Sequence, residues 1–149
     1  MTVLIINGPN LNLLGTREPK VYGVSTLAQI EQMSLNRLLQ SQINGVFFQS
    51  NAEHEIVDRV QAAANSEIDF IIINPAAFTH TSVAIRDALA AVAIPFVEIH
   101  LSNPHAREPF RKYSYFSDLA LGIIAGFGEK SYLMACDVAI DYLKDQKFN

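Results

Sequence analysis

The sequence predicts one α/β domain with a parallel sheet between two layers of helices, and three observations support this prediction. Apolar runs of strand length recur along the chain, with segments of helical spacing between them. The runs are continuous rather than alternating, as expected for strands that are covered on both faces. The 149 residues are 50% hydrophobic and 17% charged, which is enough apolar material for one core. We therefore expect a single domain over residues 1–149.

The order of the predicted elements defines the fold further. The strands are expected at Val3 to Ile6, Val46 to Phe48, Phe70 to Ile73, Phe96 to Ile99 and Leu119 to Ile124. The helices are expected at residues 26–43, 54–65, 82–92 and 131–146. Ser25 or Thr26 can cap the first helix, and Asn44-Gly45 can end it. This order favours a flavodoxin-like three-layer sandwich, an α/β fold whose five-stranded parallel sheet has the order 2-1-3-4-5.

Composition disfavours several classes of protein. The formal net charge is −4 and no long basic run occurs, which argues against nucleic acid or anionic membranes as partners. Cys136 is the only cysteine, so the chain can form neither an internal disulfide nor a thiolate metal cluster. The N-terminal apolar run lacks a basic leader and is too short to span a bilayer. We therefore expect a cytoplasmic protein.

Two connections, residues 8–25 and 101–117, are unusually long for a compact domain. Both begin at the carboxyl ends of predicted strands, where open α/β sheets bind ligands. Four polar residues follow these strand ends: Asn7, Asn51, Asn74 and His100. Glu98 lies on the same side of its strand as His100, because side chains two apart in a strand share a face. Such groups suit a polyhydroxylated substrate, and they lack the spacing of a magnesium or zinc site. The first connection also lacks phosphate-binding glycine motifs, so we expect no metal and no organic cofactor.

Each long connection contains residues that could act on an anionic substrate. Residues 15–23 hold Tyr22 near Arg17 between two glycines. A phenol is a poor base at neutral pH unless cations stabilise the phenolate, which an arginine in a closing loop could do. Residues 105–112 concentrate positive charge, and Arg107 and Arg111 could pair with a carboxylate. A solvated helical turn is the alternative interpretation of this second segment.

Five separated motifs resemble the type II 3-dehydroquinate dehydratase family, over essentially the whole chain. They are Asn7 to Gly15, Arg17 to Pro19 with Tyr22-Gly23, Asn74 to Ser82, Glu98 to Asn103, and Arg107 to Arg111. The resemblance implies a hydro-lyase of the shikimate pathway that converts 3-dehydroquinate to 3-dehydroshikimate by anti elimination of water through an enolate. It also implies one catalytic domain that uses no cofactor and assembles as a dodecamer, a tetramer of trimers.

The resemblance further implies the catalytic roles. Tyr22 would be the phenolate that removes a proton next to the substrate ketone, and Arg17 would activate it. Asn12 would hold an ordered water that stabilises the enolate. His100 would protonate the departing hydroxyl, and Glu98 would orient its imidazole.

Other positions are implied to bind the substrate. Its hydroxyls and carboxylate would be held by the positions that match Asn74, His80, Leu101, Ser102 and Arg111. Arg107 matches a loop arginine near the site. Asp87 matches a residue that reaches the site of a neighbouring subunit, so oligomerisation would be part of building the site.

Two alternatives remain open from the residues. A lysine Schiff base could serve as the electron sink, although no lysine lies in a predicted strand; the lysines are Lys20, Lys112, Lys130, Lys144 and Lys147. The alternative without lyase activity is a flavodoxin-like module that binds a small molecule or phosphate. A receiver module of this fold would need acidic groups near the first strand and an Asp ending the third, but this chain has Asn7 and Asn74 there.

Overall fold

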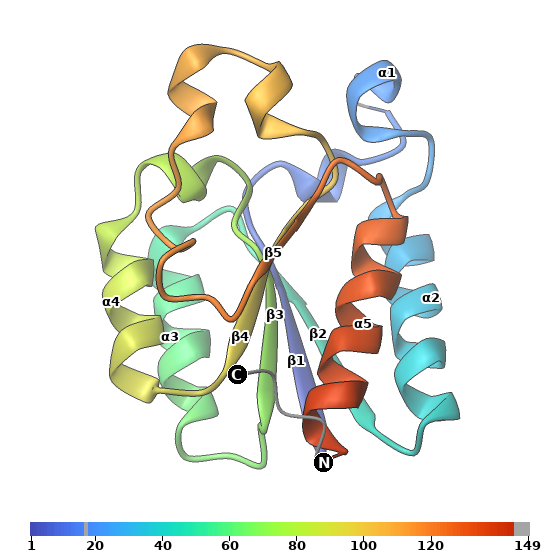
Figure 1. Ribbon diagram of the computed structural model, residues 1–149, viewed down its shortest axis with the longest axis vertical. Helices are drawn as coiled ribbons and strands as arrows, with labels where there is room; N and C mark the ends of the chain where they lie inside the picture. The colour runs from blue at the N-terminus through green and yellow to red at the C-terminus, as the bar shows by residue number, and fades with distance from the viewer. Residues whose placement is uncertain (17, 145–149) are drawn as a thin grey trace.

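A five-stranded parallel sheet forms the centre of the protein (Figure 1). The computed structural model describes residues 1–16 and 18–144. The strands lie in the order β2-β1-β3-β4-β5, which confirms the predicted order and the α/β fold class. Their bounds are β1 (Thr2–Asn7), β2 (Asn44–Gln49), β3 (Phe70–Asn74), β4 (Phe96–His100) and β5 (Ile123–Ala125).

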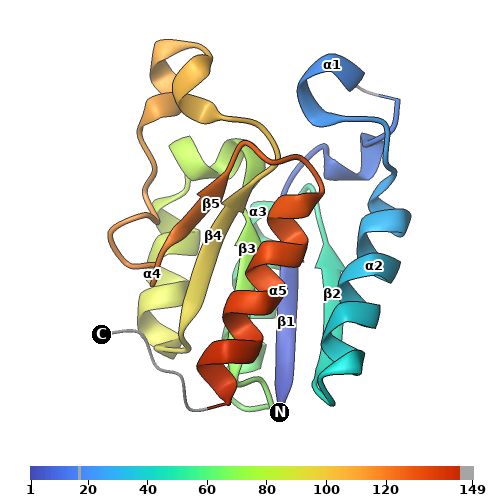
Figure 2. The ribbon, with the colours of Figure 1, turned by 45° about the vertical axis from the view of Figure 1, so that its right-hand side comes forward.

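Helices cover both faces of the sheet, which confirms the predicted three layers (Figure 2). On one face lie α2 (Leu27–Gln40) and α5 (Lys130–Leu143). On the other face lie α3 (Glu53–Ala63) and α4 (Val83–Val92). None of the helices in the described part of the chain has both the length and the apolar character of a membrane-spanning segment.

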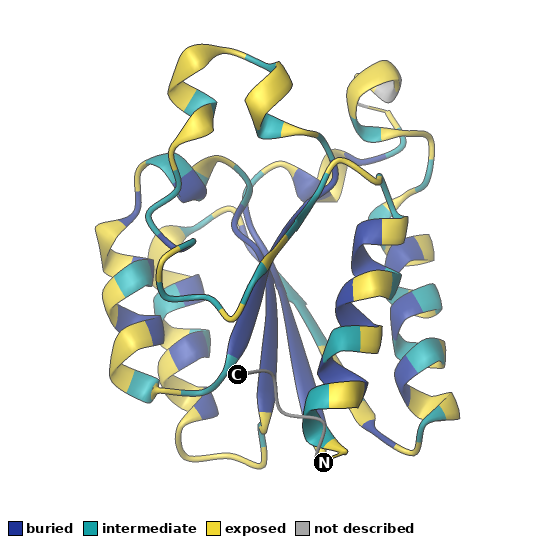
Figure 3. Cartoon of the chain, in the orientation of Figure 1, coloured by how far each residue is buried: buried dark blue, intermediate teal, exposed yellow. Residues whose placement is uncertain are grey.

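Burial on both faces explains the continuous apolar runs of the central strands (Figure 3). Every residue of β1, β3 and β4 is buried. Val3 and Ile5 belong to the core under α2 and α5, whereas Leu4 and Ile6 belong to the core under α3 and α4, because successive side chains of a strand point to opposite faces. Each fully buried aliphatic side chain stabilises the fold by about 1.5–3 kcal/mol. The buried strands therefore hold the residues at their ends in fixed positions.

The first long helix starts where predicted but ends earlier. The Thr26 hydroxyl accepts a hydrogen bond from the Gln29 backbone N–H, and the Gln29 side chain accepts one from the Thr26 N–H, which forms a capping box. The helix ends at Gln40, so the predicted end at Asn44-Gly45 is wrong. Asn44 instead begins β2, because this edge strand pairs with β1 from its first residue.

The last strand is shorter than its apolar run predicted. Only residues Ile123–Ala125 form β5, and they pair with β4. Leu119 lies in a turn, where its N–H donates to the carbonyl of Phe116, and it packs against the core beneath α3 and α4. Its apolar character therefore reflects burial outside the sheet, which an apolar run alone cannot distinguish from a strand.

The two long connections fold into short helical turns above the carboxyl edge of the sheet. The first contains η1 (Leu11–Leu13) and α1 (Pro19–Tyr22). The second contains η3 (Pro104–Ala106) and η4 (Pro109–Lys112). Figure 1 shows both at the same end of the molecule, so residues about 90 positions apart in the sequence share one region of space.

Candidate active site

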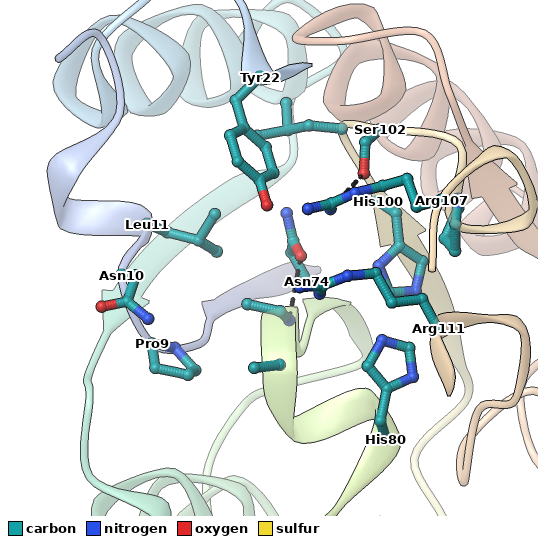
Figure 4. Close-up of a pocket in the computed structure, with 14 residues that line it drawn as sticks. Pro9, Asn10, Leu11, Tyr22, Asn74, His80, His100, Ser102, Arg107 and Arg111 are labelled. Atoms are coloured by element: carbon teal, nitrogen blue, oxygen red, sulfur yellow. Dashed lines mark hydrogen bonds between the residues drawn. The ribbon is translucent and has the colours of Figure 1, made fainter. Parts of the chain in front are cut away.

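A cavity lies where the two long connections meet the strand ends (Figure 4). It encloses about 600 Å³, including the open solvent at its mouth. Its lining residues are Pro9, Asn10, Leu11, Tyr22, Asn74, Ala76, Ala77, His80, His100, Leu101, Ser102, Pro104, Arg107 and Arg111. Two guanidinium groups in this lining favour an anionic ligand.

At the base of the cavity, His100 is paired with a buried carboxylate. His100 Nε2 lies 2.6 Å from Glu98 Oε1, and the side chain of Glu98 is fully buried. The two residues are on one side of β4, as their spacing predicted, because side chains two apart in a strand share a face. Only His100 of the two lines the cavity, so Glu98 supports the imidazole from behind.

Hydrogen bonds keep Glu98 ionised despite its burial. Burial is the largest single cause acting on its pKa and raises it, but the hydrogen bond and electrostatic attraction of His100, with hydrogen bonds from Ser117 and Ser114, together outweigh burial and hold the pKa below the ordinary 4.5. The Ser114 hydroxyl donates to Oε1 at 2.8 Å, and the Ser117 hydroxyl donates to Oε2 at 2.7 Å. An ionised carboxylate only accepts hydrogen bonds, so His100 Nε2 carries the proton of this pair. Nδ1 is therefore the ring nitrogen that remains for a ligand.

The segment that supplies both serines is fastened to α4. Arg86 forms a bidentate ion pair with Asp118, with one N–O distance of 2.8 Å, and also donates to the Tyr115 carbonyl at 2.6 Å. The side-chain hydrogen bond from Arg86 is the largest cause that lowers the pKa of Asp118. Anchoring this segment keeps the two hydroxyls against Glu98.

Tyr22 lies across the cavity from the sheet, on α1. Figure 4 shows its hydroxyl pointing into the space that the guanidinium groups of Arg107 and Arg111 also face. The Arg107 guanidinium lies over the Tyr22 ring, 5.2 Å from its centroid, and donates a hydrogen bond to the Ser102 hydroxyl at 3.2 Å. A guanidinium in this position is attracted to the electron-rich face of the ring. The structure thus places Arg107, which the sequence offered as a partner for a carboxylate, against the Tyr22 ring.

His80 and Arg111 are each held by a neighbour. His80 Nδ1 lies 2.7 Å from the Tyr113 carbonyl, so that nitrogen donates and Nε2 is left for other partners. Arg111 is hydrogen-bonded to Glu108 and lies 4.9 Å from the centroid of the Phe110 ring. The bond from Arg111 is the largest cause that lowers the pKa of Glu108. This pairing leaves other guanidinium N–H groups of Arg111 to face the cavity.

Asn74 enters the cavity from the end of β3. Its side-chain oxygen accepts from the Ala76 N–H at 3.3 Å, and its nitrogen donates to the Tyr132 hydroxyl at 2.9 Å. Neighbouring Gly8 is tightly packed, because an added Cβ would lie 2.2 Å from the Pro75 carbonyl oxygen. The ends of β1 and β3 therefore meet with no room for a side chain between them.

The cavity brings together most of the predicted site residues. Those in its lining are Tyr22, Asn74, His80, His100, Leu101, Ser102, Arg107 and Arg111. Asn12 is exposed on η1 and is not in the lining, although Leu11 before it is. Asp87 is exposed on α4, away from this cavity. Arg17 lies outside the described residues.

Sequence reasoning did not predict the two lining residues, Asn10 and Ala76, whose backbones adopt a left-handed conformation. Asn10, the residue before η1, has a left-handed φ of 67°, and its N–H donates to the Asn51 side chain at 2.9 Å. Ala76 also has a left-handed φ, of 52°. Only the Gly8-Pro9-Asn10 run, typical of a tight turn, could have indicated the first of these. In the described part of the chain, no three His, Cys, Asp or Glu side chains gather where they could hold a metal ion.

Comparisons with known proteins identify the family. Residues 1–140 match the family described as dehydroquinase class II. A 3-dehydroquinate dehydratase of Stenotrophomonas maltophilia is 63% identical over 138 residues, which cover 93% of each chain. The 3-dehydroquinate dehydratase 1 of Pseudomonas putida is 58% identical over 142 residues, covering 95% of this chain and 94% of the relative.

A solved structure agrees with these sequence relatives. The type II dehydroquinase from Butyrivibrio crossotus superposes with a TM-score of 0.91 at 44% identity, covering 93% of this chain and 96% of that one. The chain belongs to the type II dehydroquinase family.

Proposed function

We propose that the protein is a 3-dehydroquinate dehydratase, a hydro-lyase that converts 3-dehydroquinate to 3-dehydroshikimate in the shikimate pathway. The family and the dehydratase activity named for relatives up to 63% identical support this proposal. The observation that carries it is the pairing of Glu98 with His100 opposite the Tyr22 hydroxyl, around a cavity with two arginines. This arrangement offers an acid, a base and an anion-binding rim for one small hydroxy-keto acid.

The reaction begins with Tyr22 as a phenolate base. It removes a proton from the carbon next to the substrate ketone, and the electron pair moves into an enolate. Arg107 supports the phenolate from its position over the ring, and Arg17 supplies the second cation of the proposal. Closure of the loop over the substrate would exclude water and reduce the solvent screening of these charges.

The enolate is stabilised by a hydrogen-bonded water rather than by an electron sink on the protein. Asn12 holds this water in our proposal, and it follows Leu11 of the cavity lining directly. A Schiff base is disfavoured because no lysine of the described residues lines the cavity. Borohydride added with substrate should therefore leave the enzyme active, and covalent inactivation would argue for the lysine mechanism.

His100 completes the elimination as general acid. In this step His100 acts as an imidazolium that carries a proton on each nitrogen: Nδ1 gives its proton to the departing hydroxyl as the enolate collapses, and Nε2–H stays bonded to ionised Glu98. Tyr22 on α1 and His100 at the end of β4 reach the cavity from different elements. Proton removal and hydroxyl departure on opposite faces of the ring give the proposed anti stereochemistry. Stereospecifically deuterated substrate tests this step.

The remaining lining residues hold the substrate in this orientation. Asn74, His80 and the backbone of Leu101 and Ser102 bind its oxygens, and Arg111 binds at the rim. Charge-assisted hydrogen bonds of this kind contribute roughly 1.5–3 kcal/mol each. They act on the ground state and the transition state alike, so they set KM more than kcat.

Asp87 has a role in our proposal only if the chain assembles. It is exposed on α4 and outside its own cavity, so it would complete the site of a neighbouring subunit in a dodecamer built as a tetramer of trimers. Light scattering tests the assembly. Mixed assemblies of Asp87→Ala and Tyr22→Phe subunits should regain activity, because each supplies what the other lacks. No gain on mixing would refute a role between subunits.

The decisive experiment is the addition of 3-dehydroquinate to metal-free protein while the ultraviolet absorbance of the conjugated enone product is followed. Tyr22→Phe should abolish most turnover, and Tyr142→Phe, which removes a hydroxyl far from the cavity, should not. His100→Ala should slow elimination, whereas His54→Ala, at an exposed position of α3, should not. No enone from the wild-type protein would refute the proposed function. Full activity of Tyr22→Phe would refute the mechanism.

We place this single catalytic domain, residues 1–149, in the cytoplasm as part of the same proposal.

A further inference from the structure

A chain of three hydrogen bonds links β2 to Asn74, which lines the cavity. Asn7 at the end of β1 donates from Nδ2 to the Phe48 carbonyl at 3.1 Å. The Tyr132 hydroxyl of α5 donates to Asn7 Oδ1 at 2.6 Å. Asn74 at the end of β3 donates from Nδ2 to the Tyr132 hydroxyl at 2.9 Å. We call these three side chains the amide relay; each is at most 2% exposed.

The direction of every bond in the amide relay follows from its first partner. The Phe48 backbone carbonyl only accepts, so the nitrogen of the Asn7 amide must face it. The oxygen of that amide then faces Tyr132 and takes its single hydroxyl proton. With this proton used, the Tyr132 oxygen can only accept, so Asn74 must turn its nitrogen toward it.

This direction decides what Asn74 offers to a ligand. One N–H of its amide is used by Tyr132, and its oxygen accepts from the Ala76 N–H. Among the described residues the second N–H makes no hydrogen bond, and Asn74 lines the cavity. Asn74 therefore presents a donor, which matches a carboxylate or carbonyl oxygen of the substrate.

The bond to Tyr132 is the stronger of the two restraints on this amide. The bond from Ala76 is 3.3 Å long, which is beyond the usual 2.7–3.2 Å. Without the Tyr132 hydroxyl, the amide could rotate and turn its oxygen toward an anionic ligand. Burial raises the pKa of Tyr132 far above that of a free phenol, so the hydroxyl stays neutral and keeps its proton at any assay pH.

We propose that Tyr132 is a positioning residue, which holds the Asn74 amide so that its N–H faces an anionic oxygen of the substrate. The Tyr132 side chain is fully buried and lines no part of the cavity, so it acts only through Asn74. This inference rests on the proposed dehydratase function for the identity of the substrate. The relay itself is independent of that function.

Steady-state kinetics of Tyr132→Phe with 3-dehydroquinate test the proposal. KM should rise at least about tenfold with kcat within about twofold, because a misdirected amide weakens binding in the ground and transition states alike. Tyr142→Phe is the matched control, since it removes a hydroxyl from the same helix beside Phe70, away from the relay. Its KM should equal that of the wild type.

The double variant Tyr132→Phe with Asn74→Ala separates positioning from a general structural effect. Once Asn74 is gone, loss of the Tyr132 hydroxyl should change KM no further, which is the non-additivity expected of residues that act as one unit. An unchanged KM in Tyr132→Phe, or an equal increase with and without Asn74, would overturn the proposal. A fall in kcat at constant KM would overturn it too.

A second variant, Asn7→Ala, changes the other hydrogen bond of the Tyr132 hydroxyl. Asn7→Ala removes the acceptor of the Tyr132 proton, so the hydroxyl can rotate and donate toward Asn74, which turns the amide. This variant should also raise KM, and it decides alone if Tyr132→Phe does not fold. Hydrogen exchange of the Asn74 side-chain amide should be slow in the wild type and faster in either variant. That measurement tests the relay even if the wild-type protein has no dehydratase activity.

Discussion

Replacing Glu98 by Gln should destabilise the protein by an amount that depends on pH. The wild-type carboxylate accepts three hydrogen bonds, from His100, Ser114 and Ser117. A hydrogen bond to a charged group contributes roughly 1 kcal/mol more than a neutral one, so three amount to about 3 kcal/mol. Because an amide is cheaper to bury than a carboxylate, part of this loss is offset. We expect a net loss of about 1–3 kcal/mol in the free energy of unfolding at pH 7.

The pH dependence follows from the lowered pKa of Glu98. A carboxyl whose pKa is lower in the folded protein than in the unfolded chain stabilises the fold above the ordinary value, here 4.5. That stabilisation is lost as the pH falls through the folded pKa. The difference in stability between wild type and Glu98→Gln should therefore be largest near neutrality and shrink below pH 4.5.

Urea denaturation followed by circular dichroism, at fixed protein concentration from pH 7 to pH 3, measures this difference. Glu108→Gln is a matched control, because Glu108 also has a lowered pKa but forms its hydrogen bond at the surface. Its effect on stability should be small at every pH. A stability difference for Glu98→Gln that stays constant down to pH 3 would refute the reasoning. So would a Glu98→Gln protein as stable as the wild type at pH 7.

Three further predictions concern single residues. Arg107→Met removes the cation over the Tyr22 ring, so kcat should fall roughly tenfold, with Arg107→Lys retaining more activity; equal kcat values for wild type and Arg107→Met would contradict the assigned role. Gly8→Ala places a Cβ against the Pro75 carbonyl, so unfolding in urea should show a loss of about 1–3 kcal/mol, and an unaltered midpoint would mean that this contact relaxes freely. Burial raises the pKa of Cys136 to about 12, so iodoacetamide at pH 8 should label it only when urea unfolds the chain; rapid labelling of the native protein would show that the core opens there.

The sequence alone determined the sheet and the level of the site within it. Continuous apolar runs such as Val3 to Ile6 predict strands that are buried on both faces, and β1 is buried throughout. Two-residue spacing put Glu98 and His100 on one side of β4. These inferences succeeded because they depend on local periodicity and on the chemistry of parallel sheets. The predicted end of the first long helix at Asn44-Gly45 was wrong, because Asn44 pairs with Thr2 in the sheet, and this pairing joins residues far apart in the sequence.

Only the tertiary structure decided how the site residues are oriented. Tyr132 is 125 positions from Asn7 and 58 from Asn74, yet its hydroxyl joins both. Nothing in the pattern of α5 marks this residue, because a buried tyrosine and any other core residue occupy the same helical face. The stacking of Arg107 on Tyr22 likewise depends on two loops that meet in space. The packing of α5 and the loops against the strand ends sets the direction of these side chains. Because that packing joins residues far apart in the sequence, local sequence patterns do not predict it.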